Sequence, residues 1–369
     1  MASEPKYEEI QRELLAEIVA GRFAPSGRMP SEAQLVRRFK ASRPTVGRAL
    51  RILEEQNLIE RRVGSGTFVR KNPSSPAVVG SRQLGLLIPG LGTTEIFEII
   101  AGELAGVARG QDFGLLWGGG ARPTADSSSN VSEVQQWCQQ FIDRQVAGVF
   151  FAPFEHLAHQ DQTNHQLAER LRHAGIAVVL LDRDLAEFPS RSDFDLVGID
   201  NFAAGYIAVE HLLKLGTRRL AFVTRPHSAP TVSARIAGAR EAILDRGLAI
   251  PKDFVRAGEI EDATFAEALT NDPPDGIIAA NDQTAAVVIR LLQRKGLGVP
   301  KDVRVVGFDD LRLATLVSVP LTTVRQPCRE IAIVAFRAML ERLSDPTIPA
   351  RSLSLTPRLV VRESCGTYA

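Results

Sequence analysis

The sequence predicts an α/β protein in two parts, a small and mainly helical head followed by a larger body with parallel α/β sheets. Three observations support this prediction. Residues 1–72 carry a net charge of +5, whereas the remainder of the 369-residue chain carries −4. Residues 71–82 are rich in Pro, Ser and Gly, as expected of a linker between domains. Beyond them, short apolar runs alternate with helix-length segments, which is typical of a parallel sheet.

The composition is that of an ordinary globular protein, with 44% hydrophobic and 24% charged residues. It excludes collagen-like, disordered and disulfide-stapled proteins. No run of about 18 apolar residues is present, so we expect no membrane span, and the first residues lack the apolar region of a secretory signal. Cys138, Cys328 and Cys365 are far apart and have no metal-ligand spacing. We therefore expect a cytoplasmic protein.

The head, residues 1–70, begins with two predicted helices. The first spans residues 7–20, where apolar residues recur at four-residue spacing: Ile10, Leu14 and Ile18. The second starts after Ser31, which can cap the helix while Gln34 completes a capping box, and it runs to about residue 39. A tight turn at residues 40–41 then leads into the next helix.

The third predicted helix begins near residue 42 and carries a buried stripe formed by Val46, Leu50 and Leu53. Two short β segments, residues 58–62 and 67–70, follow on either side of a glycine-rich tip. This order of elements predicts a winged helix-turn-helix. The beginning of the third helix would enter the major groove of double-stranded DNA, where an arginine can form two hydrogen bonds with guanine.

Residues 30–69, PSEAQLVRRFKASRPTVGRALRILEEQNLIERRVGSGTFV, closely resemble the GntR family of bacterial regulators. The resemblance implies contacts with operator DNA at Lys6, Glu32, Ser42, Arg43, Thr45, Val63, Gly64 and Ser65. We expect Arg48, on the third predicted helix, to hold a phosphate of the DNA backbone. Many members of the family carry a second arginine where this chain has Gly47. A homodimer would place two recognition helices in successive major grooves.

The body, residues 83–369, is too long for one ordinary doubly wound unit, so we expect two lobes with a ligand between them. The predicted strands are residues 84–89, 114–117, 148–152, 177–182, 196–200, 219–224, 276–280 and 303–308. Helical patterns include residues 97–109, 203–215, 232–246 and 283–295.

Polar residues follow several of these strands. Asp182, Asn281 and Asp309 stand at strand ends, and Arg235 lies near the start of a helix. Each could simply cap a helix. Together, two carboxylates, an amide and a guanidinium are the groups that bind a neutral polyhydroxylated ligand, since they accept from and donate to its hydroxyl groups.

Four stretches of the body, residues 197–223, 233–243, 275–310 and 320–332, resemble the LacI/GalR effector-binding domain, which is similar to periplasmic sugar-binding proteins. The resemblance implies effector contacts at Asp182, Arg235, Asn281 and Asp309. It implies chain crossings between the lobes near residues 199–201, 325–327 and 351–355. Lobe one would comprise about 83–199 and 327–352, and lobe two about 200–326 and 353–369.

The first-lobe side of the pocket is less distinct in the sequence. The family places a ligand-contacting loop at residues 88–100, so Thr94, Glu95 and Phe97 are candidates for effector contacts. Trp117 ends a predicted strand and could stack on a sugar face, although a tryptophan near a strand end more often belongs to the core.

We therefore predict a DNA-binding transcriptional regulator, a repressor, whose operator affinity depends on a small-molecule effector of the carbohydrate class. Two alternatives stay open: a solute-binding protein without a regulatory role, and a nucleotide-dependent sugar enzyme, for which the G-x-G-x-x-G motif is missing. We expect neither catalytic residues nor a cofactor. His156, His159 and His165 lie within ten residues, but without cysteine ligands we expect no metal site.

Overall fold

The computed structural model describes residues 6–19, 22–23, 27–55, 58–62, 66–69, 82–89, 95–117, 127–156 and 159–367. Contacts within the chain divide it into two compact units, the head (residues 1–80) and the body (residues 81–369). The predicted α/β architecture, with a winged helical head and parallel sheets, is confirmed.

The described part of the head contains α1 (Lys6–Val19), α2 (Glu32–Phe39), α3 (Arg43–Glu55), β1 (Ile59–Arg62) and β2 (Gly66–Val69). The apolar stripes of α1 and α3 meet in one core, and Ile10, Leu14, Val46 and Leu53 are fully buried there. Strands β1 and β2 pair in antiparallel register as the wing. The predicted capping box is present: the Ser31 side chain accepts from the backbone N–H of Gln34, and Gln34 Oε1 accepts from the Ser31 N–H at 2.7 Å.

An ion pair fixes α2 against α1. Both oxygens of the Glu17 carboxylate accept from the Arg38 guanidinium, at 2.7 and 2.8 Å. The Glu17 side chain is only 11% exposed. Hydrogen bonds from Arg38 lower the pKa of Glu17, which keeps the carboxylate ionised at neutral pH. The helix that precedes the turn of the helix-turn-helix is therefore held by charge as well as by apolar packing.

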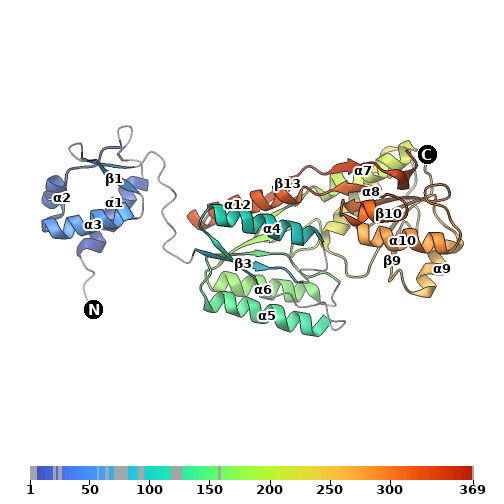
Figure 1. Cartoon of the computed structure of the whole chain (residues 1–369), viewed down its shortest axis with the longest axis horizontal. Coiled ribbons are helices and arrows are strands. Elements are labelled where there is room, and N and C mark those ends of the chain that lie inside the picture. The colour runs from blue at the N-terminus through green and yellow to red at the C-terminus, as the bar shows by residue number, and fades with distance from the viewer. Residues whose placement is uncertain are drawn as a thin grey trace. The chain divides into compact units, whose positions relative to one another are not determined.

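Lobe one of the body has a parallel six-stranded sheet in the order β13-β7-β6-β5-β3-β4. Its elements are β3 (Gln83–Leu87), α4 (Glu95–Gly110), β4 (Gly114–Trp117), α5 (Ser127–Asp143), β5 (Gly148–Phe151), α6 (Gln160–His173), β6 (Ala177–Leu181), β7 (Asp195–Ile199), α12 (Cys328–Ser344) and β13 (Ser352–Leu355). Helices α4 and α12 cover one face of the sheet, and α5 and α6 cover the other (Figure 1).

Alternation along the strands explains this layering. Leu86 and Phe150 belong to the apolar core beneath α4 and α12, whereas their neighbours Leu87 and Phe151 belong to the core beneath α5 and α6. Strands that are buried on both faces are typical of parallel sheets, because helices cover both sides.

Lobe two has a second six-stranded sheet in the order β14-β12-β11-β10-β8-β9, in which only β14 runs antiparallel to its neighbour. The described elements are α7 (Asn201–Lys214), β8 (Leu220–Thr224), α8 (Pro230–Asp245), β9 (Val255–Ala257), α9 (Ala263–Asn271), β10 (Gly276–Ala279), α10 (Asp282–Arg294), β11 (Arg304–Asp309), α11 (Leu313–Leu316), β12 (Thr322–Arg325), β14 (Arg358–Val360) and the 3-10 helix η1 (Glu363–Cys365).

The chain passes between the lobes after β7, after β12 and after β13. The third of these chain crossings lies later in the sequence than the predicted lobe boundary at residues 352–353. Strand β13 pairs with β7 along its whole length, from Ser352 opposite Leu196 to Leu355 opposite Ile199, so it belongs to lobe one. The passage therefore lies at residues 356–357, where the pairing ends.

Helices α7 and α8 approach each other through two glycines. A Cβ atom on Gly205 would lie 1.9 Å from the carbonyl oxygen of Arg235, and one on Gly238 would lie 1.9 Å from the carbonyl oxygen of Phe202. Both obstacles are backbone atoms, which a side-chain rotation does not remove. The spacing of the two helices therefore requires glycine at both positions.

We predict that Gly205→Ala lowers the free energy of unfolding by at least the roughly 1–3 kcal/mol typical of overpacking, because the added methyl meets backbone. Urea unfolding of the full chain measures this change. Gly102→Ala on α4 is the matched control, since a Cβ there has no neighbour within 4 Å, and it should raise stability by about 0.5–1 kcal/mol. Equal midpoints for Gly205→Ala and the native chain would contradict the requirement for glycine.

Candidate functional site

The beginning of α3 presents small polar and basic side chains to solvent. Lys40 adopts a left-handed conformation (φ 48°) and ends α2, after which the chain turns into α3. The Ser42 hydroxyl lies 2.7 Å from the Thr45 hydroxyl and accepts from the Thr45 N–H at 3.4 Å, so it caps α3. Arg43, in the first turn of α3, is exposed and has no ion-pair partner within the described part of the chain.

Other predicted DNA-contacting residues have partners inside the head. Lys6 forms an ion pair with Glu9 at 2.8 Å. The Arg48 guanidinium lies over the Tyr7 ring, 4.1 Å from its centroid, so this arginine also ties α3 to α1. Glu32 begins α2. The predicted wing residues Val63, Gly64 and Ser65 lie outside the described residues.

Gly47, where the chain departs from the family pattern, lies beside the Glu32 side chain. A Cβ at this position would lie 3.1 Å from the Glu32 carboxylate oxygen, which is tighter than ordinary van der Waals contact. A side chain at position 47 would therefore require the exposed Glu32 side chain to shift by a few tenths of an ångström.

In the body, polar side chains from both lobes gather where the strands end. We call this group the interlobe cluster, and it consists of Glu155, Asp182, Arg183, Asn201, Arg235, Asp309 and Gln326. Asp182 follows β6 and Asp309 ends β11, and both have positive φ values, 66° and 108°. Positive φ is uncommon for a non-glycine residue, and such conformations often cluster at functional sites.

Arg235 is the centre of the lobe-two part of the cluster. Its Nε donates to Asn201 Oδ1 at 2.8 Å and its Nη1 donates to the carbonyl oxygen of Ala280 at 2.7 Å. Its Nη2 lies 3.9 Å from Asp309 Oδ1, and its guanidinium lies over the Phe308 ring. The side chain is 4% exposed, so these contacts hold it in one orientation.

Arg183 occupies the corresponding position in lobe one. Its Nη1 lies 2.8 Å from Glu155 Oε1, its Nε lies 3.4 Å from Asp182 Oδ2, and its guanidinium lies over the Phe97 ring. Burial raises the pKa of Glu155, but the nearby Arg183 outweighs it and the net pKa is lowered. Phe97, a predicted effector contact, is thus brought to the cluster.

The cluster leaves buried polar atoms without hydrogen-bond partners. Asp182 Oδ1, Arg183 Nε and Gln326 Oε1 are all unpartnered within the described residues, although Gln326 Nε2 donates to Asp309 Oδ1 at 2.8 Å. Buried polar atoms are normally satisfied. These three atoms can therefore accept from or donate to a ligand that enters between the lobes.

The pKa of Asp309 is raised, mainly by burial. Burial raises its pKa to about 7, and the nearby carboxylates Asp182 and Glu155 contribute to the rise, while Arg235 and Gln326 oppose it. A hydroxyl donor from a ligand would stabilise the ionised carboxylate.

The other predicted effector residues have different positions. Asn281 caps α10 through Oδ1, which accepts from the Thr284 N–H at 2.8 Å, so its Nδ2 group is the atom that can donate to a ligand. Trp117 ends the edge strand β4 and is 53% exposed. Three strand spacings, roughly 14 Å, separate β4 from β6, so the structure does not bring Trp117 to the cluster. Thr94 lies outside the described residues.

Sequence reasoning missed four members of the cluster: Glu155, Arg183, Asn201 and Gln326. Three of them had a signal, because Arg183 directly follows a predicted strand end while Asn201 and Gln326 lie inside the motifs that resemble LacI/GalR. Glu155 had none, since it lies in an irregular segment after β5.

Hydrogen bonds outside the cluster also join the lobes. Glu95, a predicted effector residue at the start of α4, accepts from the backbone N–H of Arg312 at 3.1 Å. The backbone N–H of His156 donates to the carbonyl oxygen of His227 at 2.7 Å. The ring atom Nδ1 of His156 lies 3.0 Å from the carbonyl oxygen of Pro226. The lobes are thus in contact around the cluster.

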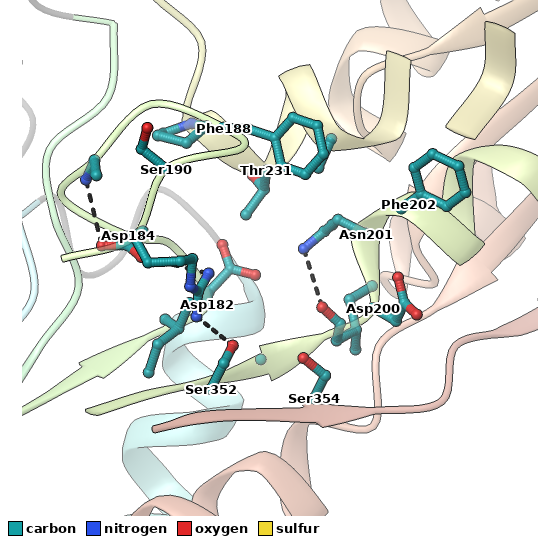
Figure 2. A pocket seen from close by; sticks show the side chains of 17 residues that line it. Asp182, Asp184, Phe188, Ser190, Asp200, Asn201, Phe202, Thr231, Ser352 and Ser354 are labelled. Atoms are coloured by element: carbon teal, nitrogen blue, oxygen red, sulfur yellow. Dashed lines mark hydrogen bonds and ion pairs between the residues drawn. The ribbon is translucent and has the colours of Figure 1, made fainter. Parts of the chain in front are cut away.

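A pocket of about 160 Å³ adjoins the cluster on the side of the chain crossings (Figure 2). It shares Asp182 and Asn201 with the interlobe cluster, and its other walls come from the β6–β7 connection, the start of α8, and β13.

Comparisons with known proteins agree with this arrangement. The model for bacterial regulatory proteins of the gntR family matches residues 6–69, and that for the periplasmic binding protein-like domain matches residues 209–365. The arabinose metabolism transcriptional repressor of Geobacillus stearothermophilus is 24% identical over 98% of this chain and 97% of its own length. The structure of a transcriptional regulator in complex with cellobiose, CelR, has a TM-score of 0.65 at 23% identity and covers 88% of this chain and 92% of its own.

A solved structure described as a transcriptional regulator of the LacI family, from Sanguibacter keddieii, is 31% identical, covers 77% of this chain and 99% of its own, and has a TM-score of 0.58. The chain belongs to the LacI family of transcriptional regulators. Within this family it carries a gntR-type head, and the arabinose repressor shows that the match extends through both parts. The resemblance inferred from the sequence is confirmed.

No helix in the described part of this LacI-family chain is long and apolar enough to cross a membrane. Likewise, no three His, Cys, Asp or Glu side chains among the described residues are arranged to hold a metal ion.

We predict that Asp309 makes the stability of this regulator depend on pH. Because folding raises the pKa of this carboxyl from 3.8 to about 7, its contribution to folding is complete below the unfolded pKa and is lost as the pH rises through about 7. The stability of the native chain relative to Asp309→Asn should therefore fall between about pH 4 and pH 8.

Urea unfolding of the full chain at a series of pH values measures this difference. Glu98→Gln, at an exposed position on α4, controls for the loss of one negative charge. The difference in the free energy of unfolding between the native chain and Asp309→Asn could also stay constant across the series. That result would show that the Asp309 carboxyl has the same pKa in the folded and the unfolded chain, and it would contradict the prediction.

Proposed function

We propose that this regulator is a sugar-responsive repressor that binds operator DNA through the start of α3 and binds a sugar at the interlobe cluster. The observation that supports the sugar site most directly is the set of three buried polar atoms that have no hydrogen-bond partner among the described residues. They belong to a cluster of three carboxylates and two guanidiniums that come from both lobes.

The chemistry of the cluster suits a neutral ligand with many hydroxyl groups. Asp182 and Asp309 accept from hydroxyls, while Arg183, Arg235 and the amide of Asn281 donate to ring and hydroxyl oxygens. Arg183 already pairs with Glu155 and Asp182, and Arg235 pairs with Asp309. Neither guanidinium therefore needs an anionic ligand, and a ligand with hydroxyl groups suits the site. The Phe97 ring adds an apolar wall, as is usual in small-molecule sites.

The relatives support the same class of ligand. One compared protein is a repressor of arabinose metabolism, and another was solved as a complex with cellobiose. Both names concern sugars.

A ligand held by both lobes would favour the arrangement in which they are in contact. In a homodimer, such a change can alter the spacing of the two recognition helices and thereby the affinity for two half-sites. The coupling required is typically about 1–3 kcal/mol. In the head, exposed Arg43 would read a base, while Lys6 and Arg48 would contact phosphates and Glu32, Ser42 and Thr45 would line the interface.

We predict that Arg43→Ala weakens binding to the preferred DNA by about 1–3 kcal/mol and relaxes selectivity at one base pair. The DNA is the sequence that the full chain selects from a random library, and fluorescence anisotropy measures affinity. Arg109→Ala, an exposed arginine at the end of α4, is the control for charge. Unchanged affinity and selectivity in Arg43→Ala would remove this residue from the readout.

The sugar assignment is tested by a thermal-shift screen of the full chain against sugars, sugar phosphates and nucleobases. A ligand at about 100 times its Kd adds roughly 2.7 kcal/mol to the free energy of unfolding. We expect a sugar to raise the unfolding temperature and Asp309→Ala to abolish that shift while DNA binding survives.

Two outcomes would reject the proposal. A response only to nucleobases would exclude the sugar. Failure of the full chain to select any DNA sequence at low salt would favour a solute-binding protein instead.

A further inference from the structure

The pocket beside the interlobe cluster has features that the cluster does not use. It is lined by hydroxyl groups of Ser190, Thr231, Ser352 and Ser354 and by the rings of Phe188 and Phe202 (Figure 2). Those two rings are 41% and 40% exposed, so each can pack against a ligand. Apolar rings together with a few polar groups are characteristic of small-molecule sites.

The charged groups in the wall are mostly satisfied within the protein. The Asp184 carboxylate accepts from the Leu185 N–H at 2.6 Å and lies 3.3 Å from an Arg191 nitrogen. Arg191 also donates to the Ser352 hydroxyl. Asp200 caps α7 by accepting from the Ala203 N–H at 2.9 Å. The pocket therefore does not call for a charged ligand.

Among the described residues, Asp182 is the charged residue in the pocket wall that keeps an unsatisfied atom. Its side chain is 4% exposed, and its Oδ1 atom has no hydrogen-bond partner in the described part of the protein. Because Asp182 lines the pocket and also belongs to the interlobe cluster, one carboxylate can accept hydroxyl groups on both sides. Asn201 makes a second connection, since it lines the pocket and accepts from Arg235 in the cluster.

The size of the pocket limits its occupant. A cavity of roughly 150 Å³ holds one benzene molecule, and this pocket measures about 160 Å³. It therefore has room for a single six-membered ring. The hydroxyl groups that line the pocket and the exposed aromatic rings suit a sugar ring, which has hydroxyl groups at its edge and C–H groups on its faces.

We propose that this pocket is a second subsite that holds a further sugar ring, so that the effector is a saccharide of two linked rings. One ring occupies the interlobe cluster and the other lies between Phe188, Phe202 and the serines of β13. This inference rests on the proposed sugar response and specifies the class of sugar.

The test is isothermal titration of the full chain with pairs of sugars, each a disaccharide and its own single ring: cellobiose and glucose, lactose and galactose, and xylobiose and xylose. At least one disaccharide should bind about tenfold or more tighter than its single ring, equivalent to about 1.4 kcal/mol.

Ser354→Phe identifies the subsite. Ser354 is exposed and faces the pocket from β13, so a larger side chain fills the space without entering the core. We expect this variant to lose the preference for the disaccharide and to keep the single-ring affinity. Ser344→Phe, an exposed serine at the end of α12 that does not line the pocket, should keep both.

The outcomes separate this inference from the proposed function. Equal binding of disaccharides and single rings, or a preference that survives in Ser354→Phe, overturns the subsite while the sugar response stands. Failure of both kinds of sugar to bind the native chain overturns the sugar response and the subsite with it. Loss of the preference in Ser344→Phe as well would show a general effect of the substitution and overturn the assignment to this pocket.

Discussion

The close approach of α7 and α8 is the constraint on which the rest of lobe two depends. Gly205 and Gly238 let each helix lie against the backbone of the other. This contact brings Asn201, at the start of α7, within 2.8 Å of Arg235 on α8. Arg235 is then aimed at Asp309, and the cluster and the adjoining pocket are built outward from this guanidinium.

The interlobe cluster is costly because it buries several charges at once. Ion pairs removed from water recover their desolvation cost only when geometry is good and every remaining polar atom is satisfied. Here the 3.9 Å separation of Arg235 and Asp309 is long, and three buried polar atoms have no hydrogen-bond partner in the part of the chain that the structure describes. A hydroxyl-rich ligand would supply the missing hydrogen bonds, and the contact between the lobes would then be stronger with the proposed ligand than without it.

Elements defined by local patterns were predictable from the sequence. The four-residue spacing in α1 and the capping box at Ser31 are local signals, and β4 occupies the predicted residues 114–117. Partnerships between distant segments were not predictable in this way. Glu155 meets Arg183 only because β5 and β6 are neighbours in the sheet, and Trp117 is kept away because β4 is the edge strand. The place of β13 likewise depends on its pairing with β7, a strand far earlier in the chain: Ser352 lies opposite Leu196.

The membership of β13 and α12 in lobe one also bears on how the protein is made. The sheet of lobe one lacks its edge strand, and one of its faces lacks the cover of α12, until residues 328–355 have been synthesised. The sheet of lobe two is likewise completed late in the chain, by its edge strand β14. The described elements of the head end at Val69 and can fold early from local contacts. During translation the body thus keeps apolar surface exposed long after the head has formed, and this is the period in which chaperones would protect it.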